Sequence, residues 1–106
     1  MENHHRKISG DRELSGEEID LINKVKAAGD ELLELQEQII SRLNFQKTVK
    51  ESRAEGSERR QPTFEEMAEY QRFNAAEPHR WAAIGKTNIQ TGVMALVRAI
   101  AQPKGV

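Results

Sequence analysis

The sequence contains no cysteine, and only 5% of its 106 residues are aromatic. The absence of cysteine excludes disulfide bonds and is compatible with a reducing cytoplasm. Hydrophobic residues make up 37% of the chain, so a single domain of this length builds only a thin core by itself. Because no disulfide or metal-ligand cluster is available to stabilise that core, we expect the chain to form a homo-oligomer.

Long apolar runs are also lacking. No stretch approaches the roughly 18 apolar residues of a membrane-spanning helix, and residues 1–10 lack the apolar segment of a secretory signal, so we expect neither membrane insertion nor secretion. The net charge is −1, whereas proteins that bind long phosphate backbones are usually basic. A nucleic-acid polymer is therefore a poor candidate partner, while a local pocket for a small anion remains possible.

Helix signals dominate the first half of the chain. Ser15 and Glu18 have the spacing of a capping box, in which each side chain bonds the backbone of the other. A heptad-like apolar stripe then predicts one long amphipathic helix, whose propensity continues through residues 46–53. The stripe comprises Ile22, Val25, Leu32, Ile39 and Leu43, flanked by Ile19, Leu33 and Ile40. Gly29 interrupts it, either as a tolerated surface glycine or as the close approach of a neighbouring helix.

The second half contains a linker at residues 55–62 and two further helices. Thr63 and Glu66 form a second capping box that opens a short helix, and Pro78 suits the first position of a third helix ending near residue 101. The third stripe comprises Ala82, Gly85, Ile89, Val93, Leu96 and Ile100. The predicted fold is all-α: a basic arm at 1–14, then a long antiparallel helical hairpin at 15–106 with a short helical insert (about 46–77) near the turn.

Patterns that support catalysis or metal binding are weak. Lys86 and its neighbours resemble the end of a phosphate-binding loop, but Arg80 stands where the first glycine is needed and the segment reads as helix. His4, His5 and His79 lack the ordered spacing of metal ligands. We therefore predict no enzymatic activity, no metal site and no cofactor.

One face of the third helix stands out. Its residues Thr87, Thr91, Met94 and Arg98 follow at i, i+4, i+7 and i+11, with Lys86 at the border. This face is either solvent-exposed or part of a pocket between packed helices in which a few donors hold an anion. In a symmetric oligomer, a single lysine becomes a ring of cations around an axis.

Four segments in order resemble a known family. They are KISGDRELS (7–15), EIDLINKVK (18–26), RWAAIGKTNIQ (80–90) and GVMALVRAIAQP (92–103). Together they are similar to the phage anti-CBASS and anti-Thoeris helical-hairpin sponges. Members of that family sequester cyclic oligonucleotides, or cyclic ADP-ribose isomers, before host effectors sense them. The resemblance covers the arm and both long helices but not residues 45–77.

The resemblance implies a homohexamer with two kinds of pocket. Residues assigned to a cyclic-dinucleotide pocket at dimer interfaces are Gly10, Asp11, Arg12, Lys26 and Arg98. Residues assigned to a cyclic-trinucleotide pocket on three-fold axes are Arg80, Lys86, Thr87, Gln90 and Thr91. Lys26 matches the family's phosphate-contacting lysine, and Lys86 with Thr87 matches its basic–threonine pair. Arg80, Gln90, Thr91 and Arg98 are added from helix geometry.

The arm departs from the family pattern at one position. The family usually has a tyrosine that stacks on a base where this chain has Asp11, a carboxylate that repels phosphate. This difference implies a weakened dinucleotide pocket or a different ligand, with Arg12 as partial compensation.

The expected function is that of a phage anti-defence protein in the cytoplasm of an infected bacterium. It binds cyclic dinucleotides and cyclic trinucleotides without degrading them and so blocks CBASS-type signalling. Two alternatives remain open, a sponge for Thoeris-type cyclic ADP-ribose isomers and a helical oligomer that docks on a host protein. Nucleic-acid binding through the basic arm is the weakest interpretation.

Overall fold

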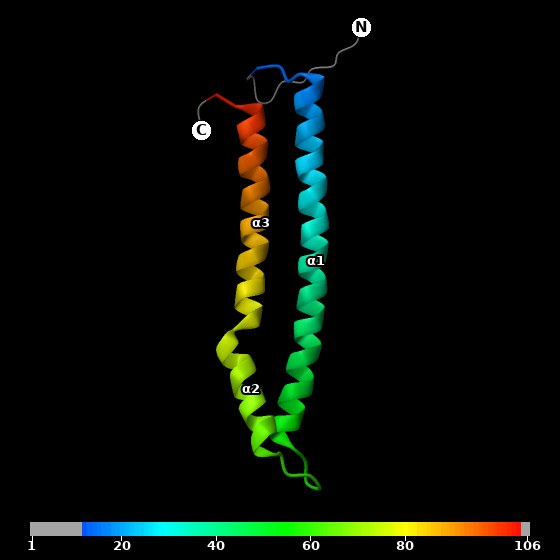
Figure 1. Ribbon diagram of the computed structural model, residues 1–106, viewed down its shortest axis with the longest axis vertical. Coiled ribbons are helices and arrows are strands. Elements are labelled where there is room, and N and C mark those ends of the chain that lie inside the picture. Colours follow the sequence, from blue (N-terminus) through cyan, green and yellow to red (C-terminus); the bar gives the residue numbers. More distant parts are fainter. Residues whose placement is uncertain (1–11, 105–106) are drawn as a thin grey trace. The chain divides into compact units, whose positions relative to one another are not determined.

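The computed structural model describes residues 12–104, which form three α-helices. They are α1 (Gly16–Glu55), α2 (Phe64–Ala76) and α3 (Pro78–Ala101), as Figure 1 shows. The predicted all-α class is confirmed. Within the described range, no helix has an apolar stretch long enough to cross a membrane.

Both predicted capping boxes are present. The Glu18 backbone N–H donates to Ser15 Oγ at 3.1 Å, and the Ser15 N–H donates to Glu18 Oε1 at 2.9 Å. The same exchange between Thr63 and Glu66 starts α2, at 3.0 and 2.9 Å. Each box satisfies backbone donors that the first helical turn leaves without partners, which is why these two helices begin where the sequence predicts.

The first helix ends at a glycine in the left-handed region. Residues 46–55 continue α1, and Gly56 then adopts a φ of 70°. A Cβ at Gly56 would lie 2.5 Å from the Arg60 carbonyl oxygen, so the turn requires glycine here. Ser57 and Arg60 close the turn with reciprocal backbone hydrogen bonds of 2.8 and 3.2 Å.

The break between α2 and α3 is short. Glu77 takes a left-handed conformation (φ 48°, ψ 52°) and donates its N–H to the Asn74 carbonyl at 3.1 Å. Pro78 follows as the first residue of α3, as predicted, since proline lacks only a donor that the first turn leaves free.

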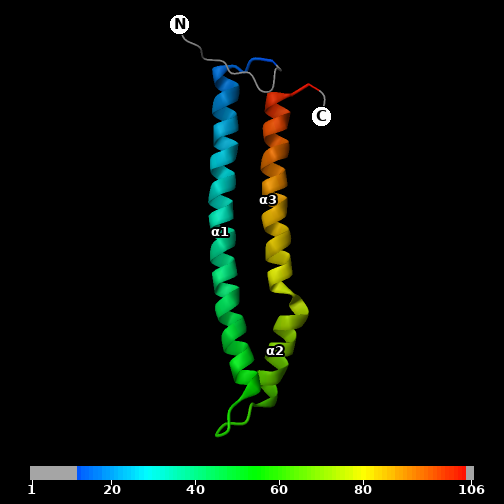
Figure 2. The ribbon, with the colours of Figure 1, turned by 180° about the vertical axis from the view of Figure 1, so that it is seen from behind.

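The described chain forms two compact units. The first combines residues 12–34 with 87–104, and in both ribbon views these parts of α1 and α3 lie side by side (Figures 1 and 2). Its core consists of the buried Leu14, Ile22 and Ala101, joined by the partly buried Ile19, Val97 and Ile100.

The second unit contains residues 35–86 and is held by polar as well as apolar contacts. Phe73 is 4% exposed, meets the His79 ring edge-on at 6.4 Å, and lies under the Lys50 ammonium at 5.9 Å. Gln36 is 8% exposed, and its Nε2 donates to the Ala82 carbonyl at 3.0 Å, which gives the buried amide nitrogen a partner. The His79 ring bonds Asn44 Oδ1 at 2.8 Å.

Three residues of the predicted apolar stripes stay exposed in the described chain. Leu32, Ile39 and Leu96 are 49%, 50% and 57% exposed, whereas Gly29 and Gln36 are buried. The buried positions of α1, Ile22, Gly29 and Gln36, are seven residues apart and so keep the heptad spacing, but two of them lack an apolar side chain. On α1 the inward positions therefore pass through a glycine and a glutamine.

At Gly29, α1 and α3 approach each other closely within the first unit. A Cβ there would lie 2.5 Å from Val93 Cγ2, a distance that real Cβ atoms do not tolerate. Of the two roles that the sequence leaves open for this glycine, the structure selects the close approach.

The Gly29→Ala variant is expected to lower the free energy of unfolding by about 1 kcal/mol. Overpacking costs about 1–3 kcal/mol and exceeds the gain in helix propensity of about 1 kcal/mol. Adding Val93→Ala should restore part of the loss, because the Gly29 Cβ position lies 3.7 Å from Val93 Cβ.

Urea unfolding at fixed protein concentration measures this effect. Gly85→Ala serves as the control, since nothing lies within 4 Å of that Cβ position, and should stabilise α3 slightly. Equal behaviour of the two alanine variants would contradict the role assigned to Gly29.

Candidate functional site

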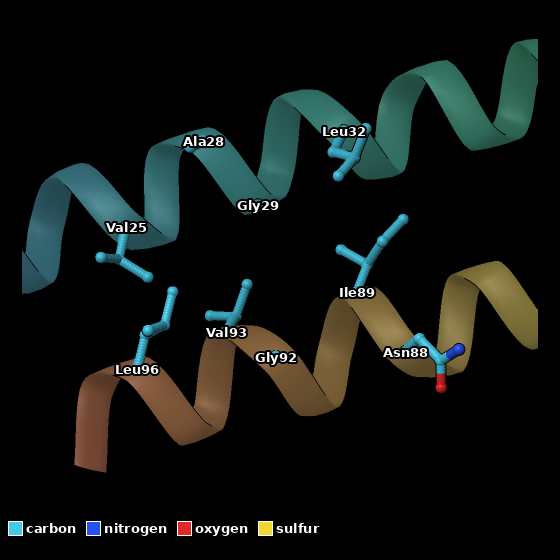
Figure 3. Close-up of a pocket in the computed structure, with 9 residues that line it drawn as sticks. All are labelled: Val25, Ala28, Gly29, Leu32, Asn88, Ile89, Gly92, Val93 and Leu96. Atoms are coloured by element: carbon cyan, nitrogen blue, oxygen red, sulfur yellow. The ribbon is translucent and has the colours of Figure 1, made fainter. Parts of the chain in front are cut away.

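An apolar groove of about 320 Å³ lies along α1 and α3 in the first unit. Its lining residues are Val25, Ala28, Gly29, Leu32, Asn88, Ile89, Gly92, Val93 and Leu96. In Figure 3, Val25 and Leu96 point toward one another from the two helices, and Val93 points toward Gly29. Leu32 and Leu96 remain about half exposed, so this groove is an apolar surface rather than a closed core.

A second depression also belongs to the first unit and has a volume of about 470 Å³; most of its lining surface is apolar, and it is called the polar hollow here only because charged residues also line it. It is lined by Lys26, Gly29, Asp30, Leu33, Gln90, Val93 and Met94. Gly29 and Val93 line both depressions. Their contact therefore lies between an apolar groove and a hollow that contains both signs of charge.

The polar side chains of the hollow have no partners within the described chain. Lys26 and Asp30 are one turn apart on α1, and Gln90 and Met94 are one turn apart on α3. Among residues 12–104, neither Lys26 nor Asp30 is in an ion pair, and Gln90 makes no side-chain hydrogen bond. A cation, a carboxylate and an amide are thus available to a ligand with phosphate and N–H groups.

The structure groups the sequence-predicted site residues differently from their assignment. Lys26 and Gln90, assigned to separate pockets, line the same hollow. Thr87, Thr91 and Arg98 are exposed on α3 and line neither depression. Met94 of the same predicted face is 65% exposed and does line the hollow.

Arg12 is occupied by contacts within the first unit. Its Nε and Nη2 donate to the carbonyls of Ala101 (3.1 Å) and Ile100 (2.7 Å) at the end of α3. Nη2 also pairs with Glu18 Oε2 at 2.8 Å. The hydrogen bond from Arg12, followed by that from the Ser15 amide, lowers the pKa of Glu18 to about 2. Arg12 thus links the start of α1 to the unsatisfied carbonyls that end α3.

The remaining predicted residues fall elsewhere. Arg80 and Lys86 belong to the second unit, where Arg80 lies 3.9 Å from Glu77 Oε1 and 5.2 Å from the Trp81 ring centre, and Lys86 is exposed. Gly10 and Asp11 lie outside the described residues. Within residues 12–104, no three side chains of His, Asp or Glu come together as metal ligands.

Asp30 is the lining residue that sequence reasoning missed. The only indication in the sequence is that Asp30 lies four residues after Lys26. Opposite charges at this spacing are usually neighbours on the exposed face of one helix. Only the packing of α3 against this face places Gln90 and Met94 opposite and turns the pair into part of a hollow.

These features place the chain among small all-helical proteins with surface depressions between packed helices. The family described as Acb2/Tad1, hairpin domain, matches residues 6–101. Anti-CBASS protein 2 of Pseudomonas phage JBD67 is 57% identical over 108 residues, covering 99% of each chain. The chain belongs to the Acb2/Tad1 hairpin family, and the predicted family resemblance is confirmed.

The Arg12–Glu18 contact predicts how stability depends on pH. The folded pKa of Glu18 lies near 2, below its ordinary 4.5, so its stabilisation is complete above about pH 4.5 and lost as the pH falls toward 2. Glu18→Gln should lower the melting temperature at pH 7, and the difference from the unmodified protein should shrink over that acid range.

Thermal melts between pH 2 and 7 measure this dependence. Glu17→Gln is the matched control, because that exposed neighbour makes no side-chain hydrogen bond within the described chain. A pH-independent gap between Glu18→Gln and the unmodified protein would argue against the assigned contact.

Proposed function

We propose that this protein is a phage anti-defence protein that binds cyclic dinucleotides and cyclic trinucleotides without degrading them. It acts in the cytoplasm of the infected bacterium and blocks CBASS-type signalling by lowering the free concentration of the signal. The observation that carries the proposal is the 57% identity to Anti-CBASS protein 2 over nearly the whole chain.

The geometry of the first unit supports a binding role. Lys26, exposed and without an ion-pair partner in the described chain, is the cation assigned to a ligand phosphate. Charge-assisted hydrogen bonds contribute about 1.5–3 kcal/mol each, so a few of them hold a small anion firmly. Sequestration requires tight binding and slow release, and several simultaneous phosphate contacts favour both.

The exposed apolar side chains support a homo-oligomer, which we propose to be a hexamer. Only four hydrophobic residues of the described chain are buried: Leu14, Ile22, Phe73 and Ala101. Leu32 and Leu96 line an open groove instead, and a second copy of this chain would remove their apolar surface from water. A symmetric assembly also repeats each cation around an axis, as expected of Lys86 in a trinucleotide pocket.

A sponge for Thoeris-type cyclic ADP-ribose isomers remains a second candidate, favoured by the family description, which includes both Acb2 and Tad1. Docking on a host protein through the apolar groove is the alternative use of that surface. Light scattering separates the cases, because a monomer at micromolar concentration would contradict the homo-oligomer and favour a heterologous partner.

Binding without turnover is tested by calorimetry followed by recovery of the ligand. A cyclic dinucleotide, a cyclic trinucleotide and a cyclic ADP-ribose isomer are titrated, and the protein is then heat-denatured. At least one of the first two should bind and be recovered intact by chromatography. Recovery of linear or hydrolysed product would identify an enzyme instead, and binding of the ADP-ribose isomer alone would favour the second candidate.

Substitutions of Lys26 and Lys86 should weaken the binding of different ligand classes. Lys86→Ala should weaken trinucleotide binding by about tenfold or more and leave dinucleotide binding unchanged, whereas Lys26→Ala should do the reverse. Lys24→Ala, an exposed lysine on α1 that lines neither depression, is the control. Equal loss of both ligands in either test variant would refute the assignment of two pockets.

A further inference from the structure

We propose that the Asp30 carboxylate accepts hydrogen bonds from a guanine base in the polar hollow. This contact makes the protein prefer guanine-containing cyclic dinucleotides over those that contain only adenine. This inference rests on the proposed function and adds to it a residue that determines base specificity.

The first observation is the position of an unpaired carboxylate beside an unpaired lysine. Asp30 is the only acidic residue that lines either depression of the first unit. In the described chain it makes no ion pair or hydrogen bond, while Glu18 of the same unit is bound by Arg12 and Ser15. Its charge is therefore available to whatever occupies the hollow.

The second observation is chemical. A carboxylate close to a phosphate site repels the anion and opposes binding unless the ligand supplies donors to it. Ionised carboxylates only accept hydrogen bonds, and their two oxygens suit a ligand that presents two adjacent N–H groups. A ligand held by its phosphate at Lys26 thus needs a donor-rich edge within reach of Asp30, one helical turn away.

Among the common bases, guanine has that edge. Its N1–H and N2–H₂ groups lie side by side and can both donate to one carboxylate. Adenine presents its N6–H₂ donor next to the N1 acceptor, which faces a carboxylate unfavourably. Bases in unpaired nucleotides are read by such hydrogen bonds on the Watson–Crick edge.

Two residues of α3 on the opposite wall of the hollow can also contact a base. Gln90 presents an amide that can donate and accept, without a side-chain partner in the described chain. Met94 is 65% exposed, and its polarizable thioether can pack against a ring face or edge. The hollow of about 470 Å³ is in the size range of small-ligand sites.

The test compares two probes on three proteins by calorimetry at neutral pH. The probes are a cyclic dinucleotide of two guanosines and one of two adenosines, and the proteins are unmodified, Asp30→Asn and Glu31→Gln. The unmodified protein should bind the guanine probe about tenfold or more tightly than the adenine probe. Asp30→Asn should remove that preference by weakening guanine binding, while Glu31→Gln, an exposed neighbour outside the hollow, should retain it.

The outcomes distinguish a failure of the role proposed for Asp30 from a failure of the proposed function. Equal affinity of the unmodified protein for both probes, or an unchanged preference in Asp30→Asn, would overturn the role of Asp30 while leaving nucleotide sequestration intact. Failure of the unmodified protein to bind either probe or any cyclic trinucleotide would overturn the proposed function and this inference together. Circular dichroism melts confirm that each variant is folded at the assay temperature.

Discussion

The contact between Gly29 and Val93 is the constraint on which the first unit depends. Because residue 29 has no side chain, α3 approaches α1 closely enough that any Cβ there would overlap Val93. The same two residues line the apolar groove and the polar hollow. This helix contact therefore shapes both surfaces, the one proposed to bind a ligand and the one proposed for self-association.

Some charged side chains of the described chain make contacts within the fold, whereas two that line the hollow do not. Arg12 binds Glu18 and two carbonyls at the end of α3, and Lys50 and Arg72 both bind Glu69, so these charges are engaged in contacts within the fold. Lys26 and Asp30 have no such partner within residues 12–104. Exposed charges that make no such contact add little to stability, which is consistent with the role in recognition proposed for these two residues.

Membership of the Acb2/Tad1 hairpin family and the open apolar groove both favour the proposed homo-oligomer. A chain with few buried hydrophobic residues gains by covering apolar surface with further copies of itself. Repetition of one subunit also multiplies a sparse set of polar groups, which lets a small helical protein surround a small anion. In the proposed homo-oligomer, stability and ligand capture would therefore derive from one assembly.

The sequence by itself determined the helical class and the starts of all three helices, because capping boxes and Pro78 act through neighbours three or four residues away. The family resemblance also assigned Lys26 to a ligand phosphate, which stays a prediction. Only the tertiary structure decided that Gly29 and Gln36 face inward while Leu32 and Leu96 stay exposed, since that depends on which part of the stripe α3 packs against. It alone placed Lys26, Asp30, Gln90 and Met94 around one hollow, because that grouping depends on how residues about 60 positions apart pack across two helices.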